Sequence, residues 1–260
     1  MPRILRNLTL LAMLGGLSLA ASAARAAEWG SIKGRFVYDG TPPVPAKLDI
    51  NKDQATCGGH NLVDQSLEVG PTGSIANVVV WLREKKVAVN PEYKKSDADK
   101  VTLDNLNCHF IPHVIGLRVG QTLVIKNSDP IAHNTKIDGL NTQVNPLVPS
   151  GQSVEVPIDA PENVPAPVSC SIHGWMHAYM VVRPNPYFAI SDKNGDFEIK
   201  NLPAGDLEFQ VWQEKSGYVT DAIIGGQATK WTKGRVKWTI EADKTTDLGT
   251  MKLAADQFNK

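Results

Sequence analysis

Short apolar runs recur along the chain, and glycine, proline, asparagine and aspartate separate them. In several of these runs apolar and polar residues alternate, which is the period of a β-strand that buries one face. The runs that we predict to be strands are residues 31–38, 77–82, 123–126, 154–156, 179–182, 196–200 and 207–212. No stretch keeps a helical period over several turns, and helical turns are expected only near Asp97 and within residues 254–258. The pattern predicts an all-β protein made of sandwiches or barrels.

Turn-forming residues divide the chain after its first 26 residues into three regions. Residues 27–99 contain Pro- and Gly-rich turns, residues 100–183 carry the candidate chemistry, and residues 184–260 begin with a Pro-Asn-Pro cluster that breaks regular structure. Residues 192–195 are predicted to form a tight hairpin connection, because an Asn-Gly pair tolerates positive φ. Residues 234–253 are expected to form two closing strands.

The first 26 residues have the pattern of a secretory signal peptide. Arg3 and Arg6 precede a largely apolar stretch at residues 8–19, and a small-x-small cleavage site follows at residues 24–26. The apolar stretch is shorter than the ~20 residues that cross a bilayer, although an uncleaved N-terminal anchor is an alternative. We therefore expect cleavage after residue 26, a periplasmic or secreted protein, and no membrane span in the mature chain.

The charges of the mature chain are nearly balanced. The full sequence holds 27 Lys and Arg and 27 Asp and Glu. The predicted signal peptide contains three of the Arg and no acid, which leaves 24 basic and 27 acidic groups and a net charge of −3. No run or stripe of basic residues occurs, so nucleic acid is not an expected partner.

A thiol, an imidazole and a thioether lie within seven residues of one another. Cys170, His173 and Met176 form a Cys-x2-His-x2-Met run, and His133 supplies a second imidazole 37 residues before Cys170. Two His, one Cys and a weak axial Met are the donors of a blue-copper electron-transfer site. Loops at one end of a sandwich can bring such distant residues together, so the pattern predicts one type 1 copper site.

This run and the His133–Asn134 pair resemble the cupredoxins of the amicyanin and plastocyanin type. The resemblance covers roughly residues 100–183 and implies a Greek-key cupredoxin β-sandwich. It implies that His133, Cys170 and His173 are equatorial copper ligands, that Met176 is the axial ligand, and that Asn134 hydrogen-bonds across to the Cys-bearing loop. Gly174 departs from the amicyanin loop, which has proline there, and we expect it to permit a tight turn. Met180 is an alternative axial ligand.

The chain has three cysteines, and export favours their pairing. If Cys57 and Cys108 form a disulfide, Cys170 remains as a thiolate that a metal would protect. An alternative is a zinc site in which Cys57 and His60 join Cys170 and His173. For His109 and His113 we expect a structural role, and an auxiliary copper or partner site is the alternative. For His177 we expect a plain surface position.

The flanking segments resemble a carboxypeptidase regulatory-like β-sandwich module. The resemblance rests on residues 30–36, 192–199 and 202–205, where Gly-x-Phe alternation and a Pro-Ala-Gly turn occur. It implies a second small β-sandwich, with the cupredoxin-like part inserted between its first and later strands. Two sandwiches in tandem are the alternative.

These features predict an exported carrier of single electrons that is not itself an enzyme. No His-x-His pair and no Cys-x-x-Cys-His sequence occurs, so a multicopper oxidase and a c-type haem protein are not expected. By resemblance, electrons would pass through an exposed edge of His173, and Trp175 would belong to an apolar docking surface. The expected partner is a cytochrome or a periplasmic oxidoreductase. A copper carrier and a structural or interaction sandwich without a redox role are the alternatives.

Overall fold

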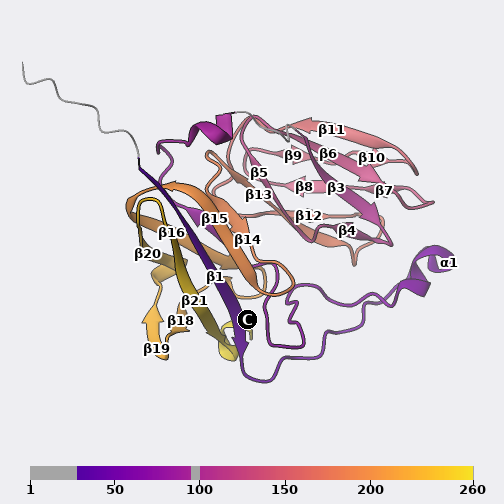
Figure 1. The fold of residues 1–260 in the computed structure, drawn as a ribbon. Helices are drawn as coiled ribbons and strands as arrows, with labels where there is room; N and C mark the ends of the chain where they lie inside the picture. The colour runs from indigo at the N-terminus through magenta and orange to yellow at the C-terminus, as the bar shows by residue number, and fades with distance from the viewer. Residues whose placement is uncertain (1–27, 95–99, 260) are drawn as a thin grey trace, which may run out of the picture.

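The computed structural model describes residues 28–94 and 100–259, and Figure 1 shows their arrangement. The all-β prediction is confirmed, because strands in several sheets make up most of the regular structure. The predicted signal peptide at residues 1–26 and the helical turn expected near Asp97 lie outside the described residues. Within the described ranges, no helix has the length and apolar character that crossing a membrane requires.

Strands from the two ends of the described chain form one sandwich, which we call the flanking sandwich. One of its sheets has the order β15-β1-β21-β18-β19, and the other has the order β14-β2-β16-β17, with β20 paired to β16. Its strands are β1 (Trp29–Asp39), β2 (Val79–Leu82), β14 (Phe188–Ile190), β15 (Asp196–Pro203), β16 (Gly205–Gln213), β17 (Gly217–Tyr218), β18 (Asp221–Ile224), β19 (Gln227–Lys230), β20 (Arg235–Ile240) and β21 (Thr245–Ala254).

The strands between β2 and β14 form the central sandwich. Its sheets have the orders β11-β6-β3-β4 and β5-β13-β12-β8-β9, and β10 pairs with β7. Its strands are β3 (Lys100–Leu106), β4 (His109–Ile111), β5 (Val114–Arg118), β6 (Thr122–Asn127), β7 (His133–Asn134), β8 (Lys136–Asp138), β9 (Gln143–Val144), β10 (Leu147–Val148), β11 (Ser153–Pro157), β12 (Ala166–Ser169) and β13 (His177–Arg183). The short helices are α1 (Gln54–Cys57), η1 (Gly58–His60), η2 (Pro91–Lys94), η3 (Thr232–Gly234) and η4 (Ala255–Phe258).

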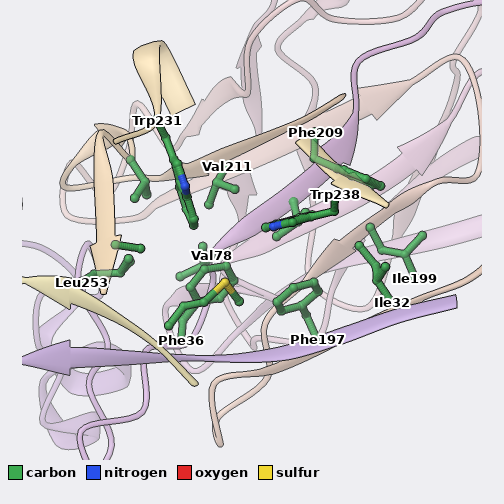
Figure 2. Packing of buried hydrophobic residues seen from close by; sticks show 14 of the residues in the cluster. Ile32, Phe36, Val78, Phe197, Ile199, Phe209, Val211, Trp231, Trp238 and Leu253 are labelled. Atoms are coloured by element: carbon green, nitrogen blue, oxygen red, sulfur yellow. The ribbon is translucent and has the colours of Figure 1, made fainter. Parts of the chain in front are cut away.

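Alternation along β1 builds the core of the flanking sandwich. Ile32, Phe36 and Tyr38 face inward and are buried, whereas Lys33 and Arg35 between them are exposed. Figure 2 shows Phe36 and Phe197 packed beneath Trp231, Phe209 and Trp238, and the rings of Phe36 and Phe197 are 5.1 Å apart. This aromatic core, rather than hydrogen bonding, supplies the main driving force for folding this half of the molecule.

Phe36→Ala is expected to lower the free energy of unfolding by roughly 3–5 kcal/mol, because it leaves a cavity among fully buried side chains. Chemical denaturation measures the change. The matched control is Lys33→Ala on the same strand, whose ion pair with Asp247 is exposed and screened by water, so its loss should change stability little. Equal effects of the two substitutions would contradict this account of the core.

A hydrophobic contact joins the two sandwiches, and strand pairing within the flanking sandwich shows where the chain passes between them. In the flanking sandwich, parallel pairing joins β1 to β21, and antiparallel pairing joins β2 to β14, with Trp81 opposite Phe188. The chain therefore leaves the flanking sandwich and returns to it on neighbouring strands. Between the sandwiches lies a buried cluster of Val79, Trp81, Val114, Val181 and Trp212, so the contact between them is apolar.

The connection at residues 192–195 differs from its prediction. Hydrogen bonds close this turn, and Gly195 has a φ of 77°, with Phe36 O only 2.3 Å from where a Cβ would lie. The strands that it joins do not pair with each other, however, since β14 pairs with β2 and β15 pairs with β1. The hairpin prediction is wrong because the turn passes the chain from one sheet to the other.

A long connection between β1 and β2 crosses to the central sandwich and carries α1 at its far end (Figure 1). A disulfide joins Cys57 at the end of α1 to Cys108, just before β4. Cys57 is fully buried in the core of the central sandwich, with Phe110, Trp175 and Met176. This connection, which the periodicity did not mark as helical, thus covers part of the central sandwich.

Candidate metal centre

Three of the predicted ligands meet at one end of the central sandwich. His133 lies on β7, Cys170 directly follows β12, and His173 lies in the loop between β12 and β13. The Nδ1 atoms of the two imidazoles are 2.9 Å apart, and Cys170 Sγ is 3.8 Å from His173 Nδ1. The three donor atoms lie within 4.8 Å of one another, and all three side chains are buried.

Backbone hydrogen bonds hold the loop of residues 170–176 in a compact form. Met176 N–H donates to His173 O, and Cys170 N–H donates to Met176 O. His173 N–H also points at Cys170 Sγ, at 3.4 Å, and a donor there stabilises a thiolate. Nothing lies within 4 Å of a Cβ added at Gly174, and its φ is not in the left-handed region. The turn is compact, as expected, and a residue other than glycine would also fit at position 174.

Asn134 connects the two chain segments that carry the donors. Its side-chain oxygen accepts hydrogen bonds from the backbone N–H groups of Ser171 and Ile172, at 2.8 and 3.2 Å, and lies 3.3 Å from Cys170 Sγ. Its amide nitrogen donates to Asn145 and Ser171. These contacts cross from β7 to the Cys-bearing loop, so Asn134 fixes the position of Cys170 relative to His133.

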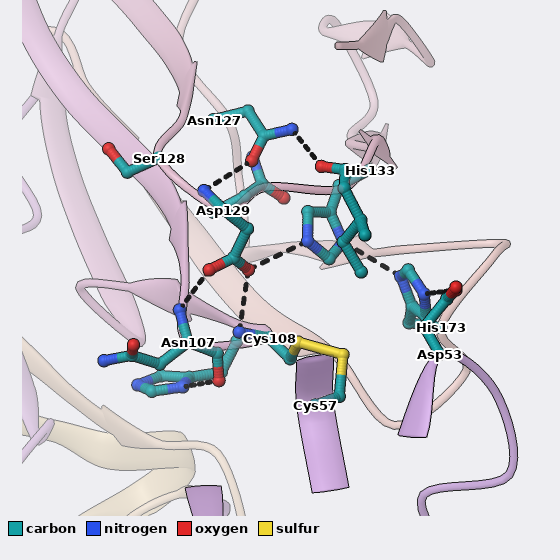
Figure 3. Close-up of polar contacts among 12 residues, drawn as sticks. Asp53, Cys57, Asn107, Cys108, Asn127, Ser128, Asp129, His133 and His173 are labelled. Atoms are coloured by element: carbon teal, nitrogen blue, oxygen red, sulfur yellow. Dashed lines mark hydrogen bonds and ion pairs between the residues drawn. A yellow bond between two sulfur atoms is a disulfide. The ribbon is translucent and has the colours of Figure 1, made fainter. Parts of the chain in front are cut away.

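A carboxylate holds the far nitrogen of each imidazole (Figure 3). His133 Nε2 is 2.9 Å from Asp129, and His173 Nε2 is 2.7 Å from Asp53. A carboxylate on Nε2 favours the tautomer with its proton there and leaves Nδ1 as a lone-pair donor, as in metal-binding histidines. Asp129 lies four residues before His133, a local spacing that the sequence analysis overlooked. Asp53 is 120 residues from His173, and no sequence pattern links them.

The electrostatics favour a neutral imidazole at His133. Burial lowers the pKa of His133 below its usual value, and the neighbouring His173 acts in the same direction. The carboxylates of Asp129 and Asp53 oppose this shift without reversing it. Since a metal binds only the neutral imidazole, the low pKa favours coordination.

The donor set fits a single transition-metal ion. Two donors that share an ion at bond lengths of ~2.0–2.3 Å lie roughly 3–4 Å apart, close to the separations of 2.9 and 3.8 Å observed here. Met176 and Met180 are both fully buried in the same cluster as Cys170. Because the two side chains are equally buried, burial does not distinguish the two candidate axial ligands. The axial role of Met176 stays a prediction.

The zinc alternative in its predicted form is wrong. The sulfur of Cys57 is bonded to Cys108, so it offers no thiolate, and Cys170 is the free cysteine of the described chain. Cys108 Sγ lies near Asp129 and His133, but the same disulfide removes it as a donor.

The structure also corrects the expected route for electrons. His173 is fully buried, because Asp53 covers its Nε2 edge, and Asp53 itself has a half-exposed side chain. Trp175 is 9% exposed, donates its Nε1–H to Cys108 O, and packs 5.0 Å from the His173 ring. Neither the imidazole edge nor this indole forms an exposed apolar surface. The chain before β2 covers both.

No protein-family model matches the chain, and no curated protein matches it. Among solved structures, a reduced variant of amicyanin is 14% identical with a TM-score of 0.30, and the match covers 40% of this chain and 98% of amicyanin. An oxidised amicyanin variant is 16% identical with the same coverage and TM-score. These neighbours are cupredoxins. A Cu-containing nitrite reductase from Thermus scotoductus SA-01 is 21% identical with a TM-score of 0.29 over 32% of this chain. The match spans 22% of the reductase.

Proposed function

We propose that this protein is an exported type 1 copper protein that transfers single electrons through the Cu(I)/Cu(II) couple and catalyses no reaction itself. His133, Cys170 and His173 are the equatorial ligands and Met176 is the axial ligand. The observation that carries the proposal is the convergence of two imidazole Nδ1 atoms and a free thiol within 4.8 Å in a buried site.

The donor set favours copper over zinc. Structural zinc takes four strong donors in a tetrahedron, whereas the donor cluster here combines one Cys with two His. A trigonal His2Cys set with a weak thioether is the arrangement of blue copper. The buried Met176 is available for that fourth role.

Copper supplies a one-electron couple when it is bound, and the protein keeps its donors in place. Asp53 and Asp129 hold the two imidazoles by their Nε2 atoms, and Asn134 fastens the loop that carries Cys170. Burial of all three donor side chains excludes water from the site. Donors fixed by packing and hydrogen bonds change little in position between oxidation states, which favours fast electron exchange.

The protein surface closest to His173 is polar. Asp53 is the half-exposed group hydrogen-bonded to His173, so a partner that approaches this ligand meets a carboxylate. We propose a cytochrome or a periplasmic oxidoreductase as the partner, bound through a small and short-lived interface.

Cys170→Ser tests the proposal. The mature protein loaded with Cu(II) is expected to show an intense visible thiolate-to-copper band and a narrow copper hyperfine splitting, because the thiolate shares its electron density with the metal. The serine variant should lose the band completely. His177→Gln, at an exposed position beside Met176, is the control and should keep it. A colourless wild-type protein with a full equivalent of Cu(II) would contradict the proposal.

A copper carrier without a redox role is the second candidate. The burial of His173 beneath Asp53 favours it, because no ligand edge is open to a redox partner. Electron self-exchange of the copper-loaded protein separates the two functions. Exchange too slow to detect supports the carrier, and rapid exchange supports electron transfer.

A further inference from the structure

A hollow of about 510 Å³ opens at one side of the flanking sandwich, between strands of its two sheets. β19 is the last strand of one sheet, and β20 pairs only with β16 among the described strands of the other, so both are edge strands. The short helix η3 connects them. Figure 1 shows β19 and β20 on the side of the flanking sandwich that lies away from the central sandwich, and therefore far from the candidate metal centre.

The charged groups that line this hollow are all positive. They belong to Lys230 on β19 and to Arg235 and Lys237 on β20, and all three side chains are exposed. None of the three forms an ion pair within the described chain, and no described Asp or Glu lines the hollow. By contrast, both cations of β1 are held in ion pairs with aspartates. We call this feature the cationic hollow, and its uncompensated charge favours an anionic ligand.

The floor of the cationic hollow is apolar. Val236 and Trp238 face into the sandwich, whereas the two cations that alternate with them along β20 face outward. Ile224 and Leu248, which are partly buried, line the hollow from the opposite sheet. A ligand that fits this site therefore carries apolar and anionic groups side by side.

The backbone edge of β20 borders the cationic hollow. Residues 235–238 all line it although their side chains alternate between two faces, so the hollow lies along the edge of the strand. Apart from their pairing with β16, residues 235–239 make no backbone hydrogen bond within the described chain. An extended peptide can pair with such an edge as an added strand. Basic side chains on an edge discourage another basic strand, but they do not repel an acidic one.

We propose that the cationic hollow binds an extended acidic segment of a partner protein, which pairs with β20 as an added strand. Side chains alternate along a strand, so the apolar ones enter the hollow and the acidic ones lie beside Arg235 and Lys237. A glycan fits less well, because Trp231 and Trp238 are only 2% and 9% exposed and offer no open ring face for stacking. The proposal does not depend on electron transfer or on bound copper.

Binding of a short synthetic peptide in which glutamate and valine alternate tests the proposal. Fluorescence anisotropy of the labelled peptide with the mature protein should show saturable binding that weakens as the salt concentration rises. Hydrogen exchange at residues 235–239 should slow in the complex. Lys230→Gln, Arg235→Gln and Lys237→Gln in one variant should weaken binding roughly 10-fold, because three surface ion pairs are lost.

The matched control is a variant with Lys47→Gln, Lys193→Gln and Lys215→Gln. It loses the same charge at exposed positions outside the cationic hollow, so it should bind the peptide as wild type does. The proposal is overturned if wild type does not bind the peptide, if the hollow variant binds it as tightly as wild type, or if a peptide of alternating glutamate and glycine binds equally well. Binding of heparin or of phosphatidylglycerol vesicles in place of the peptide would also overturn it, since the ligand would then belong to another class.

Discussion

Asp129→Ala is expected to lower the free energy of unfolding by about 3–6 kcal/mol and copper affinity by about 10–100-fold. The carboxylate accepts hydrogen bonds from Asn107 N–H and Cys108 N–H, at 2.7 and 2.8 Å, and contacts His133 Nε2 at 2.9 Å. Each donor left buried without a partner costs roughly 1–3 kcal/mol. Urea denaturation and competition with a copper chelator measure the two effects.

The predicted loss of stability is large because Asp129 holds a turn of strained backbone. Asn107 and Cys108 have φ values of 56° and 60°, a left-handed turn that side chains other than glycine adopt at a cost. Asp129 offsets that cost and couples the turn to the metal centre (Figure 3). Ser128→Ala, at the exposed neighbouring position, is the control; it removes one exposed hydrogen bond to Asp104 and is expected within about 1 kcal/mol of wild type. A copper affinity unchanged by Asp129→Ala would contradict the role assigned to this carboxylate.

Replacing Cys57 and Cys108 together with alanine is expected to lower the free energy of unfolding by roughly 4 kcal/mol. The bond spans a sequence separation of 51 residues, and removing it restores the conformational freedom of that loop in the unfolded chain. In the folded protein, α1 and Asp53 lose their attachment to the central sandwich. Thermal unfolding measures the first effect, and hydrogen exchange over residues 53–60 measures the second.

Gly59→Ala gives a matched control for the disulfide variant. A Cβ at Gly59 meets no atom within 4 Å, and its φ is not left-handed, so the change should stay below about 1 kcal/mol. If the disulfide variant leaves exchange over residues 53–60 as slow as in wild type, the bond does not hold this segment in place.

The strands could be predicted from the local pattern of apolar and polar residues. Contacts between segments far apart in the sequence could not, because no local pattern encodes them. The alternation at residues 31–38 identified β1 (Trp29–Asp39) because the period of two is a property of the strand alone. The spacing of residues 170–176 marked a loop whose donors lie close together for the same local reason. The cover over His173 was missed because the family resemblance spans residues 100–183 and contains nothing of the segment with Asp53.

The candidate metal centre includes residues that lie outside the central sandwich. Neighbouring strands β2 and β14 mark where the central sandwich begins and ends, so by topology alone it is a transferable unit. Asp53 and Cys57, however, come from the chain before β2. A recombination event that exchanged the central sandwich between two genes would carry all the donor atoms and leave their cover behind. The donor atoms alone are therefore an incomplete centre, which also needs the flanking chain that supplies Asp53 and Cys57.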